Sequence, residues 1–227
     1  MEVKLVIDRL RSLGDPKAVE GMTRFGIQSS NSLGVSVPRL RTLAREVGRD
    51  HMLALKLWET GLHDARLLAT MVDDPRKVTL EQMDKWVRDF DSWDVVDGSC
   101  GNLFDKTPFA VAKAKQWCKR EEKFVKRAGF VMMAELAVHD KEAKDKVFLD
   151  FLPLIVGGAS DERNFVKKAV NWALRQIGKR NMKLNKAAVS TARRIRKIDS
   201  GAAKWVAADA LRELKSPQVL KRLRKTK

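Results

Sequence analysis

Apolar residues along this chain recur every three or four positions, which is the period of an amphipathic α-helix. The first such segment, residues 2–14, has apolar side chains close to this period at Val3, Leu5, Val6, Leu10 and Leu13. Strand signals are nearly absent, because the chain has no alternating β-branched runs and no Asn-Gly hairpin turns. The pattern predicts an all-α protein built from short helices.

Residues at the ends of the periodic segments predict where individual helices begin and end. Ser36 precedes a helix that has a proline in its first turn and stops at Gly48. Thr79 and Gln82 have the spacing of a capping box, in which each side chain bonds the backbone of the other residue. Thr107 is followed directly by a proline, so we expect it to begin the next helix.

Four segments of the chain resemble one another, and each carries a cation at a corresponding place. The last three of these cations are 41 and 36 residues apart, whereas the first gap, 61 residues, indicates an intervening divergent unit. This period predicts HEAT-like helical pairs, stacked into an α-α superhelix, a curved solenoid with a basic concave face. An ordinary helical bundle with accidental self-similarity is the alternative. The four cations are Arg66, Arg127, Lys168 and Lys204.

No linker or low-complexity stretch divides the chain, so we expect one HEAT-like repeat domain over residues 1–227. The loosest parts, residues 29–38 and 154–164, are expected to be loops between helices. The N-terminus carries charges throughout, and no apolar run reaches the length of a signal peptide or a membrane span. We therefore expect a cytoplasmic protein, associated with the nucleoid.

The charge of the chain indicates what kind of partner it has. Lys and Arg together number 46 against 29 Asp and Glu, which gives a net charge of +17 and favours a polyanion such as nucleic acid. The segment 165–198 contains cations and no acid. Solvated surfaces usually mix both signs of charge, so this segment is more typical of one that binds a phosphate backbone. A basic amphipathic helix on an anionic membrane is the alternative. The cations of this basic block are Lys167, Lys168, Arg175, Lys179, Arg180, Lys183, Lys186, Arg193, Arg194, Arg196 and Lys197.

The cysteines and histidines do not have the spacing of a metal site. Cys100 and Cys118 form no CxxC motif, and the three histidines are scattered. We expect buried thiols in a reducing compartment. We expect neither a metal nor a cofactor, and in particular no nucleotide cofactor. His63 and Asp64 are expected to be the solvated start of a helix, with a position facing the groove as the alternative. Four tryptophans are expected to pack in the core or between repeats: Trp58, Trp86, Trp117 and Trp205.

The stretch SWDVVD, residues 92–97, places Trp93 and Asp97 one turn apart on a helix that begins after Ser92. Alone, this pattern is more typical of a core aromatic residue and a solvated acid. Together with Arg127 in VKRAGF, Trp172 in KKAVNWALRQ and the segment GVSVPRLRTLAREV, it resembles the DNA alkylation repair proteins of the AlkD-like group. The resemblance covers residues 22 to 214, approximately.

The resemblance implies a HEAT-like solenoid and a DNA glycosylase of base excision repair. Such an enzyme hydrolyses the N-glycosidic bond of cationic N3- or N7-alkylpurines in double-stranded DNA. Trp93 and Trp172 would flank the damaged nucleotide, while Arg127 would contact the DNA backbone. Asp97 would stabilise the oxocarbenium-like sugar and orient the attacking water. The family motif often has two adjacent tryptophans, whereas here Ser92 precedes Trp93.

The chemistry agrees with this pairing of an acid and indole rings. A purine alkylated at N3 or N7 is already a good leaving group, so its departure needs little general-acid help. A carboxylate beside the sugar stabilises the developing cation, and each indole face adds about 0.5–2 kcal/mol. No lysine stands out as a Schiff-base nucleophile, so we expect a monofunctional, monomeric enzyme. The residues expected to bind DNA are Arg127, Lys167, Lys168, Arg175, Lys179 and Arg180.

Two other functions fit the same sequence. A non-catalytic HEAT-repeat protein would keep the basic face and bind branched or distorted DNA. A HEAT scaffold would instead grip an acidic protein partner. The sequence does not decide whether a damaged base leaves the helix during the reaction.

Overall fold

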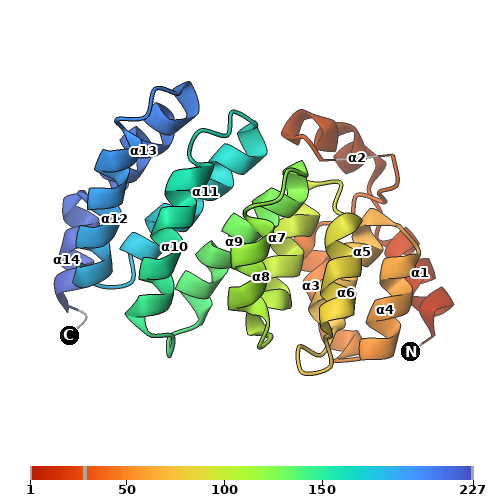
Figure 1. The fold of residues 1–227 in the computed structure, drawn as a ribbon. Helices are drawn as coiled ribbons and strands as arrows, with labels where there is room; N and C mark the ends of the chain where they lie inside the picture. The colour runs from red at the N-terminus through yellow and green to blue at the C-terminus, as the bar shows by residue number, and fades with distance from the viewer. Residues whose placement is uncertain (1, 28–29, 226–227) are drawn as a thin grey trace. The chain divides into compact units, whose positions relative to one another are not determined.

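The computed structural model describes residues 2–27 and 30–225, and all regular structure in these ranges is helical (Figure 1). The all-α prediction is confirmed. The α-helices are α1 Val3–Ser12, α2 Pro16–Met22, α3 Val37–Val47, α4 His51–Glu59, α5 His63–Val72, α6 Leu80–Arg88, α7 Trp93–Asn102, α8 Ala110–Trp117, α9 Lys123–His139, α10 Asp145–Gly158, α11 Asn164–Gly178, α12 Met182–Ile195, α13 Gly201–Leu214 and α14 Pro217–Lys225, and two short 3-10 helices are η1 Thr23–Phe25 and η2 Phe104–Lys106.

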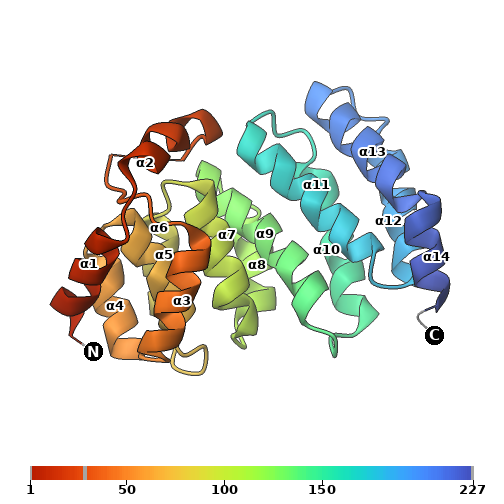
Figure 2. The same ribbon diagram turned by 180° about the vertical axis from the view of Figure 1, so that it is seen from behind.

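The chain forms two compact units, which meet in sequence between Thr107 and Pro108. Unit 1 contains α1 to α7, and unit 2 contains α8 to α14. Within unit 2, α8 packs on α9, α10 on α11 and α12 on α13, and the second helices α9, α11 and α13 pack side by side (Figures 1 and 2). In unit 1, α5 packs against α3, α4 and α7. The expectation of a single domain over residues 1–227 stays a prediction.

The repeat period found in the sequence corresponds to the second helices of the pairs. The predicted intervening unit is present, because α7 begins at Trp93, midway between the start of α5 at His63 and that of α9 at Lys123. The two later repeats begin at Asn164 and Gly201. Five helices of the described chain therefore repeat one element, as HEAT-like pairs require.

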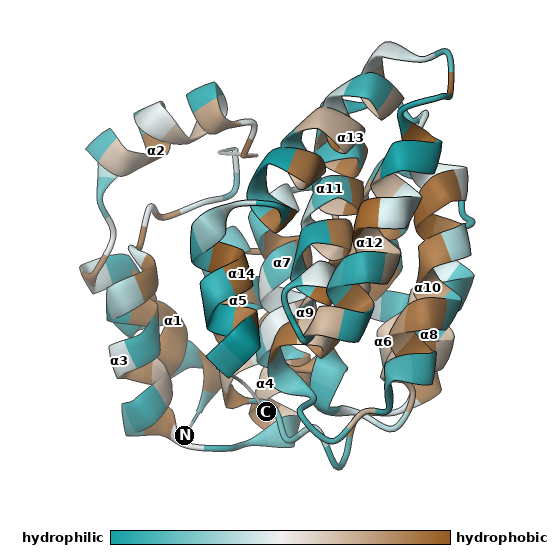
Figure 3. Cartoon of the chain, turned by 90° about the vertical axis from the view of Figure 1, so that its left-hand side faces the viewer, coloured by the Kyte–Doolittle hydropathy of each residue, from teal (hydrophilic) through white to brown (hydrophobic). Residues whose placement is uncertain are grey.

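Each unit is held together by large side chains on the inner faces of these helices. In unit 1 the rings of Trp58 and Trp86 stack in parallel at 3.9 Å, and both side chains are fully buried. In unit 2 the fully buried side chains include Phe130, Phe148 and Phe151. Brown apolar and teal polar positions alternate along the helices in Figure 3, as the sequence periodicity predicts.

Several helix boundaries agree with the sequence signals. The helix after Ser36 begins and ends where predicted, and Gly48 closes it with a φ of 73° that favours glycine. The Thr79 hydroxyl accepts a hydrogen bond from the Gln82 amide at 3.1 Å, so Thr79 caps the N-terminus of α6. The capping box is only half formed, because the Gln82 side chain donates to the carboxylate of Asp73 at 2.7 Å instead.

Other boundary predictions were wrong. Thr107 does not begin α8, which starts at Ala110, because its hydroxyl donates to the carbonyl of Phe104 at 2.8 Å. The first half of residues 154–164 is not a loop, since α10 continues to Gly158. In the other expected loop, residue 29 lies outside the described residues and residues 37 and 38 already belong to α3.

The predicted burial of the tryptophans and cysteines is confirmed with one exception. Trp58, Trp86 and Trp117 are at most 2% exposed, and both cysteines are buried. Burial raises the pKa of the Cys118 thiol to about 11, which keeps it unreactive. Trp205 is 41% exposed and so lies outside the core, but Lys167 of the neighbouring repeat lies over its ring, which agrees with the predicted alternative of packing between repeats. Within the two described ranges, no helix is both long and apolar enough to cross a bilayer.

Candidate functional site

The helix α7 places the predicted tryptophan and acid on one side of unit 1. It begins at Trp93, directly after Ser92, as predicted. Its inner face, which includes Val96 and Cys100, is fully buried, and α7 packs against α5. Trp93 and Asp97 are half-buried and lie one turn apart, so both side chains project from the same side of the helix.

The ring of Trp93 is fixed by a distant part of unit 1. Its indole Nε1–H donates a 2.9 Å hydrogen bond to the carbonyl of Phe25 in η1. The two residues are 68 positions apart, so no local pattern indicated the contact. Because the polar edge of the indole is bound to backbone, its apolar surface is held in one orientation.

A buried network holds the first turn of α7. The carboxylate of Asp94 lies 2.9 Å from Nε2 of His63 on α5, accepts from the Val95 amide at 3.0 Å, and accepts a short hydrogen bond from the Ser92 hydroxyl. His63 is 5% exposed. Ser92, the departure from the family's paired tryptophans, therefore contributes a hydroxyl that orients Asp94 beside Trp93.

The His63–Asp94 pair perturbs the titration of both groups. Burial alone would lower the pKa of His63, but the hydrogen bond and charge of Asp94 outweigh it and raise this pKa above 6.5. Burial alone would raise the pKa of Asp94, but His63 and Ser92 lower it below 3.8. The two groups therefore form an ion pair at pH values between the lowered pKa of Asp94 and the raised pKa of His63, and this pair ties α7 to α5.

The solvated helix start predicted for His63 and Asp64 was wrong, because both side chains are buried. The carboxylate of Asp64 accepts hydrogen bonds from the segment before α3. The donors are the Leu33 amide at 2.6 Å, the Val35 amide at 2.7 Å and the Ser32 hydroxyl at 3.0 Å. A carboxylate that satisfies three donors has a structural role.

Asp97 occupies a special position in the repeat. The residue three or four places after the start of each second helix is a cation in four of the five repeats. In α7, Asp97 stands at that place, four residues after Trp93. The repeat therefore carries one negative charge where its other copies carry a positive one. The four cations are Arg66, Arg127, Lys168 and Lys204.

Unit 2 carries the other residues of the predicted site. Arg127 on α9 is 6% exposed, and its guanidinium donates to the carbonyl of Phe165 at the start of α11 at 2.6 Å. Trp172 is half-buried in the middle of α11, one turn after the exposed Lys168. Arg127 thus links two successive repeats, and its contact with DNA stays a prediction.

Two of the predicted DNA-binding cations are paired with acids of α13. Arg175 and Lys179 both bond the carboxylate of Glu213, Lys179 at 2.6 Å, and Arg175 also lies 3.7 Å from Asp209. Burial would raise the pKa of Glu213, but these two cations lower it. The local absence of acids in the basic block is therefore compensated from the next repeat. A search for opposite charges one repeat apart would have found this pairing.

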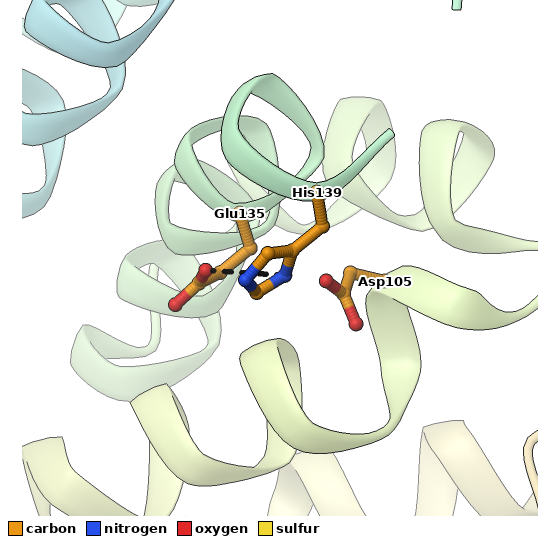
Figure 4. A group of neighbouring side chains, drawn as sticks. All are labelled: Asp105, Glu135 and His139. Carbon is orange, nitrogen blue, oxygen red and sulfur yellow. Dashed lines mark ion pairs between the residues drawn. The ribbon is translucent and has the colours of Figure 1, made fainter. Parts of the chain in front are cut away.

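Arg180 caps the end of another helix. Its guanidinium donates to the carbonyl of Ala137 at 2.8 Å and lies 4.1 Å from the centre of the Phe148 ring. Burial lowers its pKa. Close by on α9, Nδ1 of His139 lies 3.6 Å from the carboxylate of Glu135, one turn earlier (Figure 4).

Most exposed cations of the basic block lie outside the set that was predicted to bind DNA. Besides Lys168, it falls on α12 and the residues that follow it, which the sequence reasoning included in the block but did not select. Lys167 is half-buried, with its ammonium 5.4 Å from the ring centre of Trp205. The exposed cations of α12 and its end are Lys183, Lys186, Arg193, Arg194, Arg196 and Lys197.

These repeated pairs define a HEAT-like helical-repeat protein. A solved structure from a new family of proteins related to the HEAT-like repeat DNA glycosylases, with affinity for branched DNA structures, shares the fold. Its TM-score is 0.76 at 19% identity, over 94% of this chain and 96% of that chain. The family model for DNA alkylation repair enzymes matches residues 6–214. The chain belongs to that family, and the resemblance noted in the sequence is confirmed.

Two curated relatives come from Listeria. The uncharacterized protein Lin0241 of Listeria innocua is 27% identical over 130 residues, which are 56% of this chain. The uncharacterized protein Lmo0209 of Listeria monocytogenes is 26% identical over a segment of the same length. The match spans 58% of the length of each relative.

Proposed function

We propose that this protein is a monofunctional DNA glycosylase that hydrolyses the N-glycosidic bond of cationic N3- or N7-alkylpurines in double-stranded DNA. The observation that carries the proposal is the charge at the repeated position. Four repeats place a cation there, and α7 places Asp97 there, one turn from the fixed ring of Trp93. An acid at this position weakens the attraction of the protein for phosphates, so it needs a compensating role.

That role is to stabilise a transition state. As the bond to an alkylated purine stretches, positive charge moves from the base onto the sugar. A carboxylate near the sugar stabilises this charge more strongly in the transition state than in the ground state, which is the condition for catalysis. The same carboxylate orients the water that attacks the sugar. Trp93 presents an indole surface to the cationic nucleotide, and Trp172 keeps the flanking role that the family resemblance implies.

The basic residues supply general DNA affinity in this proposal. Each phosphate that a lysine or arginine neutralises releases counterions, so binding weakens as the salt concentration rises. Lys167, Lys168 and the exposed cations of α12 are suited to this task. Arg175 and Lys179 share Glu213 and reach a phosphate only by exchanging that partner. The protein acts as a monomer in the cytoplasm, on the DNA of the nucleoid.

The test is release of the modified base from duplex DNA that contains N7-methylguanine. Asp97→Asn should lower the single-turnover rate by about 10²–10³, the usual cost of losing one preorganised electrostatic partner. Asp91→Asn is the matched control, because this acid precedes α7 and its side chain is 49% exposed. Equal rates for Asp97→Asn and the wild type would refute the assignment of Asp97. No release by the wild type would refute the glycosylase itself.

A non-catalytic role is the second candidate, and the HEAT-like relative with affinity for branched DNA structures favours it. In that case Asp97→Asn removes a repulsive charge, so it should bind a four-way junction as well as or better than the wild type does. Base release would then be absent from both proteins. Competition between junction and linear duplex, measured beside base release, separates the two functions.

A further inference from the structure

Trp205 lies at the surface of unit 2, in the first turns of α13. It is more exposed than the other five tryptophans, which are buried or half-buried. Its neighbours one turn before and after it, Gly201 and Ala208, are also exposed. Because both are small, no bulky side chain at these two positions of α13 covers the indole. Lys167 approaches the ring from α11, with Nζ 5.4 Å from the ring centre.

A second group of this kind lies on the other side of α11. The rings of Phe124 on α9 and Phe165 on α11 are 5.9 Å apart, and both are half-buried. The ammonium of Lys123 is 4.3 Å from the first ring centre and 5.7 Å from the second. The starts of α9, α11 and α13 lie side by side (Figures 1 and 2). Lysines and aromatic rings therefore alternate across three successive repeats.

The acids near this edge are already engaged in the fold. Glu162 accepts from the Ser200 hydroxyl at 2.9 Å and from the Ala202 amide at 3.0 Å, and so caps α13. Asp161 pairs with Arg163 at 2.6 Å. Lys123 and Lys167 both lie over ring faces. The hydrogen bonds by which Glu162 caps α13 lower its pKa, and the neighbouring Lys167 also helps to lower it. An anionic ligand can bond either ammonium group without breaking these hydrogen bonds.

We propose that the edge formed by Lys123, Phe124, Phe165, Lys167 and Trp205 binds single-stranded DNA by stacking unpaired bases. Trp205 provides the exposed stacking face, and Lys167 provides the adjacent positive charge for the phosphate. A base has a free face only where it is unpaired or unstacked, so the edge selects single strands over intact duplex. Aromatic rings interleaved with cations are the usual means of binding single strands without sequence preference.

This site does not depend on the proposed glycosylase. The two proposals share Lys167, but stacking uses Trp205 on α13, whereas the proposed reaction uses Asp97 and Trp93 on α7 and Trp172 on α11. Undamaged DNA is the ligand of this site, and no bond is made or broken. The two ideas can therefore fail separately.

The experiment compares two oligonucleotides of equal length, one of thymidines and one of abasic sites, by fluorescence anisotropy with the full chain. Both carry the same phosphates, so their difference in affinity reports stacking. The wild type should bind the thymidine strand more tightly than the abasic strand, and Trp205→Leu should lose about tenfold in affinity for the thymidine strand only. Trp205→Phe should recover part of the loss, since a smaller ring still stacks.

The controls separate stacking from charge and from catalysis. Lys186→Ala removes an exposed cation of α12 and should weaken binding of both strands equally. Trp205→Leu should keep the helical circular dichroism spectrum of the wild type and unfold cooperatively, and it should release N7-methylguanine at the wild-type rate. Two results would overturn the proposal: equal affinity of the wild type for both strands, or undiminished thymidine binding by Trp205→Leu.

Discussion

Asp94→Asn tests whether the buried network at the start of α7 holds unit 1 together. The replacement keeps the size of the side chain and one acceptor oxygen, but it removes the charge that faces His63 at 2.9 Å. A hydrogen bond to a charged group contributes about 1.5–3 kcal/mol to stability. We therefore expect a loss of about 2 kcal/mol, which lowers the melting temperature by about 4–8 °C in a domain of this size.

The effect of Asp94→Asn should depend on pH in a defined direction. The pKa of His63 is raised above 6.5, so its contribution is complete below pH 6.5 and is lost as the pH rises through the folded-state pKa. The pKa of Asp94 is lowered below 3.8, so its contribution is present above pH 3.8 and is lost as the pH falls through the folded-state pKa. The difference in free energy of unfolding between the wild type and the variant should be largest in the window from pH 3.8 to 6.5.

The assay is thermal or urea denaturation, followed by circular dichroism, at pH 5.5 and at pH 9. Asp91→Asn is the control, because its half-exposed carboxylate lies 3.7 Å from Arg66 and such pairs contribute about 0–1 kcal/mol. A loss for Asp94→Asn no greater than that of the control, or the same loss at both pH values, would show that the His63–Asp94 pair does not stabilise the fold.

Three further outcomes follow from single contacts. Gly129→Ala should lower the free energy of unfolding, measured by urea denaturation, by about 1–3 kcal/mol, because its Cβ would lie 2.6 Å from Cα of Cys118. Gly157→Ala is the control, since open space surrounds Gly157 and no stability should be lost. Equal losses for the two variants would contradict the packing argument. Glu213→Gln should steepen the salt dependence of DNA binding by about one charge in anisotropy titrations, because it releases the cations of α11, and an unchanged slope would exclude them from the interface. Asp64→Ala removes the acceptor of three hydrogen bonds, so it should lower the free energy of unfolding by about 3 kcal/mol and speed amide hydrogen exchange in the segment before α3. Unchanged exchange in that segment would contradict this prediction.

Local patterns predicted the parts of the fold that depend on neighbours in sequence. The start of α7 after Ser92 and the end of α3 at Gly48 followed from helical periodicity and from residues with special backbone preferences. The intervening repeat was found because a cation recurs at one place in the repeat. Thr107 failed because a threonine before a proline also suits a turn, and its hydroxyl bonds the preceding segment.

Contacts between distant segments could not be predicted in this way. The partner of the Trp93 indole is a backbone carbonyl 68 residues away, and any residue can provide a carbonyl. Side-chain pairs between successive repeats could be predicted more readily from the sequence. Asn171 with Asp209 and Arg175 with Glu213 are each 38 residues apart. Complementary residues at the repeat period are therefore a signal that a single-helix pattern does not contain.

The acid among the repeated cations has a consequence for how such proteins diversify. Asparagine is one nucleotide change from aspartate and lysine is two, so the negative charge at position 97 is readily lost by mutation. Under the proposed function, a copy of this scaffold with a neutral or basic residue there would bind nucleic acid more tightly but would not stabilise the sugar cation. If Asp97 acts as proposed, inheritance of the architecture alone does not preserve the reaction, and the charge of residue 97 distinguishes the family members that can catalyse it from those that only bind DNA.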